Sequence, residues 1–437
     1  MSAELWTADR IAEADRRYVI HSWSTQGAIK PKVITGGEGS WFWDADGRRY
    51  LDFQSQLVNM NLGHQHPRLV EAIADAARDL CYMGPGFAVR SRAELAERLA
   101  ALAPGDLEMT FFTTGGAEAN ESAIRLARHV TGRPKVIARY RSYHGATAGA
   151  LQLTGDERRW AGEPFVSGVV RMLEPDPYRR PADDPVNLGR PHLEEILAGE
   201  GPQNVAAIIV EPVTGTNGML YPPDGYLQAL REVCDEHGIL LVFDEVMVGF
   251  GRTGTMFASE HWDVVPDVMT TAKGLNSGYV PLGAMTVSSA IGDWLQDHKF
   301  WAGQTYAGHP LACASGVASL EIMESEDVLG RLAPVAEHLA ARLQALADTH
   351  PSIGDVRGRG AFYGIELVAD RMTKAPLAGV VPTVCAAAMQ EGLYLTGNAN
   401  VLRIAPPLVV TREEVDLAVD ILDSVLSLAD AELEAAA

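Results

Sequence analysis

The chain has 437 residues, of which 47% are hydrophobic and 21% charged, and its formal net charge at pH 7 is −21. This length allows two or three domains with a large core, and the composition is typical of a folded protein. The negative charge and the absence of a basic run exclude nucleic acid and anionic membranes as expected partners.

The N-terminus and the cysteines favour a cytoplasmic protein. The opening residues, MSAELWTADRIAEADRR, are acidic and lack an apolar core, so we expect neither a signal peptide nor a transit peptide. No apolar run is long enough to cross a bilayer. The four cysteines, Cys81, Cys234, Cys313 and Cys385, are far apart in the sequence and form no CxxC pair. This pattern fits a protein of a reducing compartment.

The N-terminal part of the chain predicts an arm and a hairpin. Residues 1–35 indicate a helical arm followed by a loop. In Gly39–Phe53, the turn-forming Ala45–Gly47 separates two aromatic-rich strands, which predicts a β-hairpin. His64 and His66, in GHQHP, lack an HExxH pattern or a cysteine cluster, so we expect a turn into a helix and no metal site.

From about residue 67 to about 320, apolar strands alternate with segments of helical period. Val205–Pro212 and Ile239–Val246 are continuous apolar runs, as expected for parallel strands covered on both faces. Between them, Asp224–Gly238 opens on an N-cap candidate and closes on glycine, which predicts a helix. This alternation is typical of βαβ units in a parallel sheet.

The segment Phe111–Arg128, FFTTGGAEANESAIRLAR, predicts a strand that meets two glycines and then a helix. Backbone N–H groups at Gly116 and Ala117 would favour an anion at the helix N-terminus. No Walker or GxGxxG pattern is present. Taken alone, the segment favours an ordinary strand-to-helix turn, whereas beside the lysine described below a cofactor phosphate is the better interpretation.

Arg141–Thr147, RSYHGAT, predicts a short loop after a strand. The ring of Tyr143 could stack on a flat heterocycle there. A buried structural tyrosine is the alternative. We interpret His144 as structural.

Lys273 carries the strongest chemical signal. The predicted strand before it ends in Asp244 and Glu245, and the lysine follows 29 residues after Asp244 on a glycine-bounded turn, TTAKGLNSG. This arrangement indicates a pyridoxal phosphate (PLP) site, in which the lysine bonds to the cofactor aldehyde and the aspartate holds a proton on the pyridine nitrogen. Val246, one pleat from Asp244, would pack under the ring opposite Tyr143. A neighbouring side chain is expected to partner the buried Glu245.

Glu211 and Arg403 are far apart in the sequence but both lie in apolar segments, VEPVTGTNG and VLRIAPPL. A buried arginine needs an acidic partner or an anionic ligand. We therefore expect the two to pair in the empty site, with Arg403 released to bind a substrate carboxylate.

After about residue 320 the pattern changes. Leu332–His350 predicts a long helix, Val356–Leu367 a strand with glycine kinks, and Thr411–Glu414 a capping box that opens a C-terminal helix. We expect this tail to pack with the N-terminal segment. The predicted division is an N-terminal arm with part of a small domain, a large cofactor-binding domain, and the rest of the small domain, at residues 1–66, 67–320 and 321–437.

Taken together, the motifs resemble class III aminotransferases, the ω-transaminase group of PLP enzymes of fold type I. The resemblance covers nearly the whole chain and is carried by GHQHP, TTGGAEANESAIRLAR, SYHGAT, EPVTGTNGMLYPPDGYL, LLVFDEVMVGFGRTG, AKGLNSGYVPLGAM, TYAGHPLACA and LRIAPPL. It implies an α/β fold: a large domain with a mostly parallel seven-stranded sheet covered by helices, and a smaller α+β domain from the N- and C-terminal segments. It also implies a homodimer, or a tetramer, with active sites at the subunit interface.

The resemblance assigns a role to each matching position. It implies that Lys273 bonds the cofactor and shuttles the proton, Asp244 binds the pyridine nitrogen, and Tyr143 and Val246 enclose the ring. It implies that Gly116 and Ala117 bind the cofactor phosphate and that Thr305 contacts the phosphate of the neighbouring subunit's cofactor. It also implies that Trp23 lies at the substrate entrance, and that Arg403 binds a carboxylate and is gated by Glu211. In one departure from the family pattern, the phosphate loop reads Gly115-Gly116-Ala117 and lacks side-chain hydroxyls.

The implied reaction is ping-pong transamination through pyridoxamine phosphate. The donor would be an ω-amino acid or primary amine such as taurine or β-alanine, because HSWSTQG through QLVNMNLGHQHP resembles taurine–oxo acid transaminases. The acceptor would be pyruvate or 2-oxoglutarate. An aminomutase, a decarboxylating aminotransferase, a PLP-fold protein without turnover and a nucleotide-binding αβ protein are the alternatives.

Overall fold

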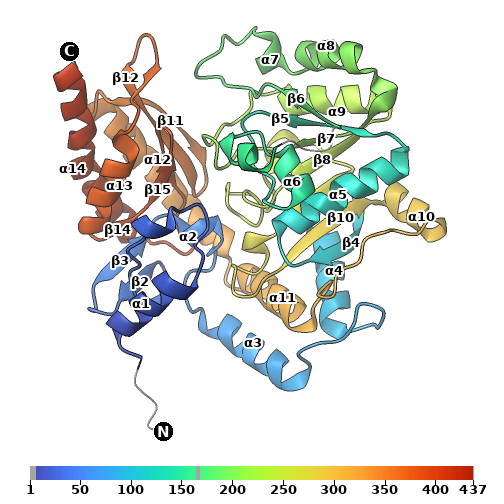
Figure 1. Ribbon diagram of the computed structural model, residues 1–437, viewed down its shortest axis with the longest axis horizontal. Helices are drawn as coiled ribbons and strands as arrows, with labels where there is room; N and C mark the ends of the chain where they lie inside the picture. The colour runs from blue at the N-terminus through green and yellow to red at the C-terminus, as the bar shows by residue number, and fades with distance from the viewer. Residues whose placement is uncertain (1–5, 164–167, 437) are drawn as a thin grey trace.

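A computed structural model describes residues 6–163 and 168–436 (Figure 1). Its largest sheet has seven strands in the order β4-β10-β9-β8-β7-β5-β6. β10 is antiparallel to both of its neighbours, and the other adjacent strands are parallel. This confirms the predicted mostly parallel sheet. The strands are β4 (Leu107–Thr113), β5 (Lys135–Arg139), β6 (Val169–Met172), β7 (Val205–Val210), β8 (Leu240–Asp244), β9 (Val268–Thr271) and β10 (Gly283–Ser288).

Helices cover both faces of this sheet because the side chains of its central strands are apolar on both sides. Every residue of β7 is buried. Ile208 and Val210 pack in one core cluster with the helices α8 (Arg190–Glu200) and α9 (Tyr226–His237). Ile209, whose side chain points to the opposite face, packs in a second cluster with α5 (Gly116–Thr131). The remaining helices of this part are α3 (Pro67–Asp79), α4 (Arg90–Leu102), α6 (Ala148–Leu153), α7 (Pro185–Leu188), α10 (Ser289–Asp297) and α11 (Pro310–Ser325).

The predicted helix at Asp224–Gly238 is present as α9, two residues shorter at its start. Gly225, not Asp224, is its N-cap residue. At its other end Gly238 adopts φ +58°, the left-handed conformation that glycine allows without strain.

The N- and C-terminal segments lie together at one side of the molecule (Figure 1). The predicted hairpin is confirmed: β2 (Trp41–Asp44) and β3 (Arg49–Asp52) pair antiparallel, with β1 (Ile34–Glu38) beside β2. β14 (Leu393–Tyr394) adds to β3 in parallel and so joins the two chain ends in one sheet. A second sheet has the order β11-β12-β16-β15 with β13 paired to β12, and its strands are β11 (Ile353–Arg359), β12 (Phe362–Asp370), β13 (Ala375–Pro376), β15 (Thr396–Asn398) and β16 (Val401–Ile404).

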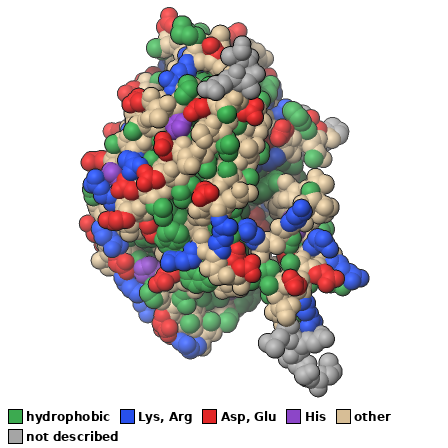
Figure 2. Space-filling view, turned by 90° about the vertical axis from the view of Figure 1, so that its left-hand side faces the viewer, with side chains coloured by type: hydrophobic (Ala, Val, Ile, Leu, Met, Phe, Trp, Pro, Cys, Tyr) green, Lys and Arg blue, Asp and Glu red, His purple; other side chains and the backbone are tan. Residues whose placement is uncertain are grey.

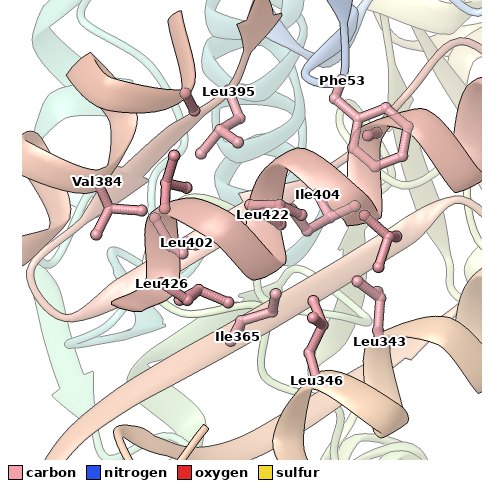
Figure 3. Packing of buried hydrophobic residues seen from close by; sticks show 14 of the residues in the cluster. Phe53, Leu343, Leu346, Ile365, Val384, Leu395, Leu402, Ile404, Leu422 and Leu426 are labelled. Atoms are coloured by element: carbon pink, nitrogen blue, oxygen red, sulfur yellow. The ribbon is translucent and has the colours of Figure 1, made fainter. Parts of the chain in front are cut away.

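Helices pack on these small sheets through a shared apolar core. Figure 3 shows Leu422 and Leu426 beside Ile365 and Leu402 in this core. The predicted capping box opens the last helix: Glu414 N donates to Thr411 Oγ1 at 3.2 Å, and Thr411 N donates to a Glu414 carboxylate oxygen at 2.9 Å. The helices of this part are α1 (Ala8–Tyr18), α2 (Ser55–Val58), α12 (Val328–Thr349), α13 (Val380–Gln390) and α14 (Arg412–Ala436). The domain boundaries at 66/67 and 320/321 remain predictions.

One predicted element is wrong. Val356–Leu367 is not a single kinked strand but most of the β11–β12 hairpin. Gly360 turns the chain with φ +60°, and a Cβ at this position would lie 2.4 Å from Gly254 N. The glycine therefore marks a turn against a neighbouring loop, a contact that strand periodicity does not reveal.

The surface carries charges of both signs. Figure 2 shows acidic and basic side chains interspersed over one face of the molecule. Among the described helices, none combines the length and apolar character needed to cross a membrane.

The two histidines of GHQHP contact carboxylates, His64 with Asp52 at 2.8 Å and His66 with Glu326 at 3.3 Å.

Candidate active site

The predicted site residues of the large sheet lie where neighbouring parallel strands end. Asp244 is the last residue of β8, Glu211 directly follows β7, and Lys273 lies two residues after β9. Tyr143 lies on the loop after β5, as the sequence predicts. Because parallel strands present their carboxyl ends at the same edge, four strands contribute to one site, which is the usual place for ligands in such sheets.

Asp244 is held by three donors. One carboxylate oxygen accepts a hydrogen bond from Asn120 Nδ2 at 2.7 Å and lies 2.7 Å from His144 Nδ1. The other accepts from Val246 N at 3.0 Å. Thr270 Oγ1 donates to Asn120 Oδ1 at 2.7 Å, which fixes the orientation of that amide. The carboxylate thus has a single well-defined position in a buried environment.

Two of these partners add to the sequence interpretation. His144, interpreted as structural, contacts Asp244 directly, and its Nε2 is buried without a hydrogen-bond partner among the described residues. Asn120 was not identified from the sequence. Its signal is a polar residue between Ala119 and Ala123 on the buried face of α5.

Lys273 has an unusual backbone and a partly buried side chain. It opens the short 3₁₀ helix η5 (Lys273–Leu275) with φ +42°, a conformation rare outside glycine. In the described part of the chain, no hydrogen bond or ion pair engages its Nζ. Such strained residues concentrate at functional sites.

The charges around Lys273 act on its amine in both directions. Burial is the main cause that lowers the pKa of Lys273 below its ordinary value, and the positive charges of Arg403 and Arg158 lower it further. Asp244 and Glu211 oppose this shift. The net result favours the neutral amine, the form that can accept a proton or attack a carbonyl carbon.

The N-terminus of α5 is suited to an anion. Its N-cap residue, Gly115, provides no side-chain cap, and the first N–H groups of a helix lack partners within the helix. A Cβ at Gly116 would lie 2.6 Å from Cγ1 of Val246, so the bare backbone is required there. Gly116 and Ala117 could therefore hold a phosphate through their amides alone.

Val246 lies beside the α5 N-terminus, but not for the reason predicted from strand alternation. It does not share a strand face with Asp244, because β8 ends at Asp244 and Val246 lies in the following turn. The strand alternation used to predict its direction therefore does not apply, although its side chain does contact the α5 terminus.

Tyr143 lies between two other large side chains. The guanidinium carbon of Arg158 is 4.0 Å from the centre of its ring. Trp23 meets it edge-on, with ring centres 6.4 Å apart, and is itself 65% exposed. An exposed tryptophan beside a partly buried tyrosine is consistent with the rim of a site.

Glu211 and Arg403 do not form the predicted ion pair among the described residues. The Glu211 carboxylate accepts hydrogen bonds from the backbone amides of Tyr143 at 3.1 Å and Gly215 at 2.7 Å. Arg403 Nη2 donates to Thr396 Oγ1 at 2.7 Å, and its Nε is buried without a partner in the described residues. The pair is absent because backbone groups already satisfy the acid.

Arg158 is a second cation that the sequence did not reveal. It lies in the 3₁₀ helix η2 (Glu157–Gly162), and its Nε donates to Asp156 at 3.0 Å, while Nη2 contacts the same carboxylate. Asn217 Nδ2 donates to Asp156 at 2.8 Å. No described group bonds Nη1 of Arg158. An arginine in GDERRW carries no sequence signal that distinguishes it from a surface charge.

Two further predicted residues lie apart from this cluster. Thr305 is in an exposed turn, where its carbonyl accepts a hydrogen bond from Tyr82 OH at 2.9 Å. Glu245 is directed into the core, where it accepts hydrogen bonds from the backbone amides of Ala258 at 3.0 Å and Ser259 at 2.8 Å.

Comparison with known proteins identifies the family of this site. The family described as Aminotransferase class-III matches residues 24–426. The chain belongs to the class III aminotransferases. It is 41% identical to a probable aminotransferase of Mycobacterium tuberculosis (91% of this chain, 90% of that protein) and 34% identical to a taurine–pyruvate aminotransferase of Bilophila wadsworthia (92% and 93%).

A solved structure extends this likeness to the fold. The taurine:2-oxoglutarate aminotransferase of Bifidobacterium kashiwanohense, in complex with PLP and glutamate, superimposes with a TM-score of 0.95 at 41% identity and covers 98% of this chain and 100% of that chain. The aminotransferase is therefore a PLP-dependent enzyme that transfers an amino group from an amine donor to a 2-oxo acid.

The residues present fit this cofactor. A fixed buried carboxylate suits a protonated ring nitrogen, an uncapped helix N-terminus suits a phosphate, and a partly buried amine of lowered pKa suits an aldehyde. The three lie at or just after the carboxyl ends of β8, β4 and β9, which lie at one edge of the sheet, with the antiparallel β10 between β4 and β9.

Proposed function

We propose that this aminotransferase moves the amino group of an ω-amino acid with a distal carboxylate or sulfonate, such as taurine or β-alanine, to a 2-oxo acid by a ping-pong reaction. The observation that carries this proposal is a pair of arginines near Lys273: the guanidinium carbon of Arg158 lies 4.0 Å from the ring centre of Tyr143, Arg403 has a buried Nε without a partner among the described residues, and both positive charges lower the pKa of Lys273. Two cations beside one amine suit substrates that carry an acid at a distance from the reacting group.

Lys273 and Asp244 are the proposed catalytic residues. PLP, when bound, supplies an electron sink for charge that develops at the substrate carbon. Asp244, whose position is fixed by Asn120 and His144, would hold a proton on the ring nitrogen of the bound cofactor. Lys273 accepts and returns the substrate proton at Nζ, which the lowered pKa permits.

The proposed cofactor contacts follow from the same geometry. Tyr143 and Val246 enclose the ring, and Gly116 with Ala117 bind the phosphate through backbone amides. Because Gly115 and Ala117 provide no hydroxyl, all of the helix-terminal contribution comes from N–H groups and the helix dipole.

The proposed substrate contacts are Trp23 at the entrance and the two arginines. Arg403 has a buried Nε that no described residue partners, and so it retains capacity for a carboxylate. Glu211 lies close enough to influence Lys273. Its proposed role as an acid that alternates with substrate for Arg403 requires it to leave the amides of Tyr143 and Gly215.

We further propose a cytoplasmic homodimer in which Thr305 reaches the phosphate of the neighbouring subunit's cofactor. An exposed turn that holds Thr305 beside the exposed aromatic residues Tyr82 and Tyr306 supports this assignment. Large exposed aromatic side chains are typical of protein interfaces.

The test is a donor and acceptor panel with arginine variants. Arg403→Ala should raise KM for the 2-oxo acid far more than KM for an uncharged amine such as 1-phenylethylamine. Arg158→Ala should lower kcat/KM for taurine and β-alanine by roughly 10- to 100-fold, since a hydrogen bond to a charged group contributes about 1.5–3 kcal/mol. Equal losses with charged and uncharged donors would contradict the role of either arginine.

A further inference from the structure

We propose that strand β15 (Thr396–Asn398) positions both arginines and thereby sets the length of the acid that the site accepts. The inference rests on the proposed function, since it assumes that Arg403 and Arg158 bind acidic groups. It assigns a specificity role to Thr396 and Asn398, which do not themselves need to touch the substrate.

The first arginine is tied to the start of β15. Thr396 and Arg403 are directly paired across the antiparallel β15–β16 ladder, so their side chains lie on the same face. Arg403 Nη2 donates to Thr396 Oγ1 at 2.7 Å, a short bond for a charged donor. On the far side of β16, Arg403 pairs with Gly364 of β12, so the arginine lies on a strand that is paired on both sides.

The second arginine is tied to the end of β15 through two side chains. Asp156 holds Arg158 by Nε and Nη2, and Asn217 Nδ2 donates to Asp156 at 2.8 Å. Asn398 Nδ2 in turn lies 3.3 Å from Asn217 Oδ1. This last hydrogen bond is longer than the usual value of about 2.9–3.0 Å, so we expect it to contribute less than the bond from Arg403 to Thr396.

The geometry of β15 fixes the distance between Thr396 and Asn398, the two residues through which the strand holds the arginines. Residues 396 and 398 are two apart, so both side chains leave the same face of the strand about 6.6 Å from each other. The turn that follows is anchored, because the buried Asn400 Nδ2 donates to Leu367 O of β12 at 2.7 Å. A short strand fixed at its turn thus holds the two cations at a set separation.

The experiment measures the binding of dicarboxylates of increasing length to the PLP-loaded enzyme by calorimetry, with malonate, succinate, glutarate and adipate as probes and propionate as a single-acid reference. The parent should prefer one length. Thr396→Val, which removes the hydroxyl, should reduce the advantage of that length over the others about tenfold, or about 1.4 kcal/mol. Asn398→Ala should reduce it by roughly threefold, in keeping with its longer bond.

Two controls separate positioning from general damage. Thr396→Ser keeps the hydroxyl and should retain the parent's length preference within about twofold. Thr349→Val, on the exposed end of α12, should change neither affinity nor preference. Because Asn398 is exposed, its alanine variant carries the test alone if Thr396→Val does not fold.

An equal loss of affinity for every length and for propionate in Thr396→Val would overturn the inference, because the strand would then support one arginine and not the spacing of two. A parent without any length preference would also overturn it. Neither result bears on amino transfer itself, which the donor panel with the arginine variants measures separately.

Discussion

At the residue scale, Glu245 shows how the neighbour of a proposed catalytic residue, Asp244, can have an unrelated structural role. Its side chain is fully buried and bonds the backbone amides that open the 3₁₀ helix η4 (Ala258–Trp262). Burial raises the pKa of Glu245 to about 7, with the two amide hydrogen bonds opposing the shift. The adjacent Asp244 instead contacts Asn120, His144 and the amide of Val246, so the two neighbouring carboxylates at the strand end have separate sets of partners.

This shift predicts a pH-dependent stability. A carboxyl whose pKa is higher in the folded chain favours folding most at low pH, and its contribution falls as the pH rises from the unfolded value of about 4.3 towards the folded value of about 7. Glu245→Gln removes the titration. The free energy of unfolding of the variant relative to the parent should therefore increase by about 2 kcal/mol between pH 5.5 and pH 8.

Urea unfolding at the two pH values measures this change, and Glu337→Gln, at an exposed position of α12, is the matched control. A difference between Glu245→Gln and the parent that stays constant with pH would show that Glu245 titrates normally. The offset at pH 5.5 is a separate quantity, because glutamine faces two backbone donors with one acceptor oxygen.

The same scale shows where the sequence was informative. Lys273 and Asp244 could be singled out because a strand that ends in an acid and a lysine on a glycine-bounded turn form a local pattern, and their catalytic roles stay predictions. Arg158 and the contact between His144 and Asp244 could not, since they depend on which loops meet at the sheet edge. The expected pairing of Glu211 and Arg403 is absent because the acid instead accepts hydrogen bonds from two backbone amides, that of Gly215 four residues later and that of Tyr143 on the loop after β5.

At the element scale, α5 carries two functions on one turn and a half. Its N-terminus is the proposed phosphate site, and Asn120, on its buried face, donates a hydrogen bond to Asp244. The strand, glycine pair and helix were all predicted from FFTTGGAEANESAIRLAR. The β11–β12 hairpin was missed because the apolar pattern runs through its turn, and only Gly360 marks the reversal.

The tight packing at Gly116 gives a direct test of this helix terminus. Gly116→Ala would place a Cβ 2.6 Å from Cγ1 of Val246, a stiff β-branched side chain that cannot move far. Overpacking of this kind costs about 1–3 kcal/mol, so the Kd for PLP should rise roughly tenfold or more. Equilibrium dialysis or fluorescence titration of the cofactor measures the change.

Gly199→Ala is the matched control, because a Cβ there meets no atom of the described residues within 4 Å. It should leave the Kd for PLP unchanged. Unaltered PLP affinity in Gly116→Ala would remove the α5 terminus from the proposed phosphate site.

At the scale of the whole molecule, the site joins parts of the chain that are far apart in the sequence. β5, β7, β8 and β9 supply residues from the large sheet, while the N-terminal arm supplies Trp23 and β16 supplies Arg403. The β3–β14 pair joins the N-terminal and C-terminal segments in one sheet, so Trp23 and Arg403 both come from the part of the molecule that these segments form. Sequence patterns predicted this layout of elements, but the distances between their side chains required the fold.

The central claim is that PLP bonds covalently to Lys273. Borohydride reduction of the PLP-loaded enzyme, followed by proteolysis and mass spectrometry, should place the reduced cofactor on the peptide that contains TTAKGLNSG, at Lys273, and Lys273→Ala should lose both the label and amino transfer. A label on another lysine, or none on an enzyme that still transfers amino groups, would contradict the account.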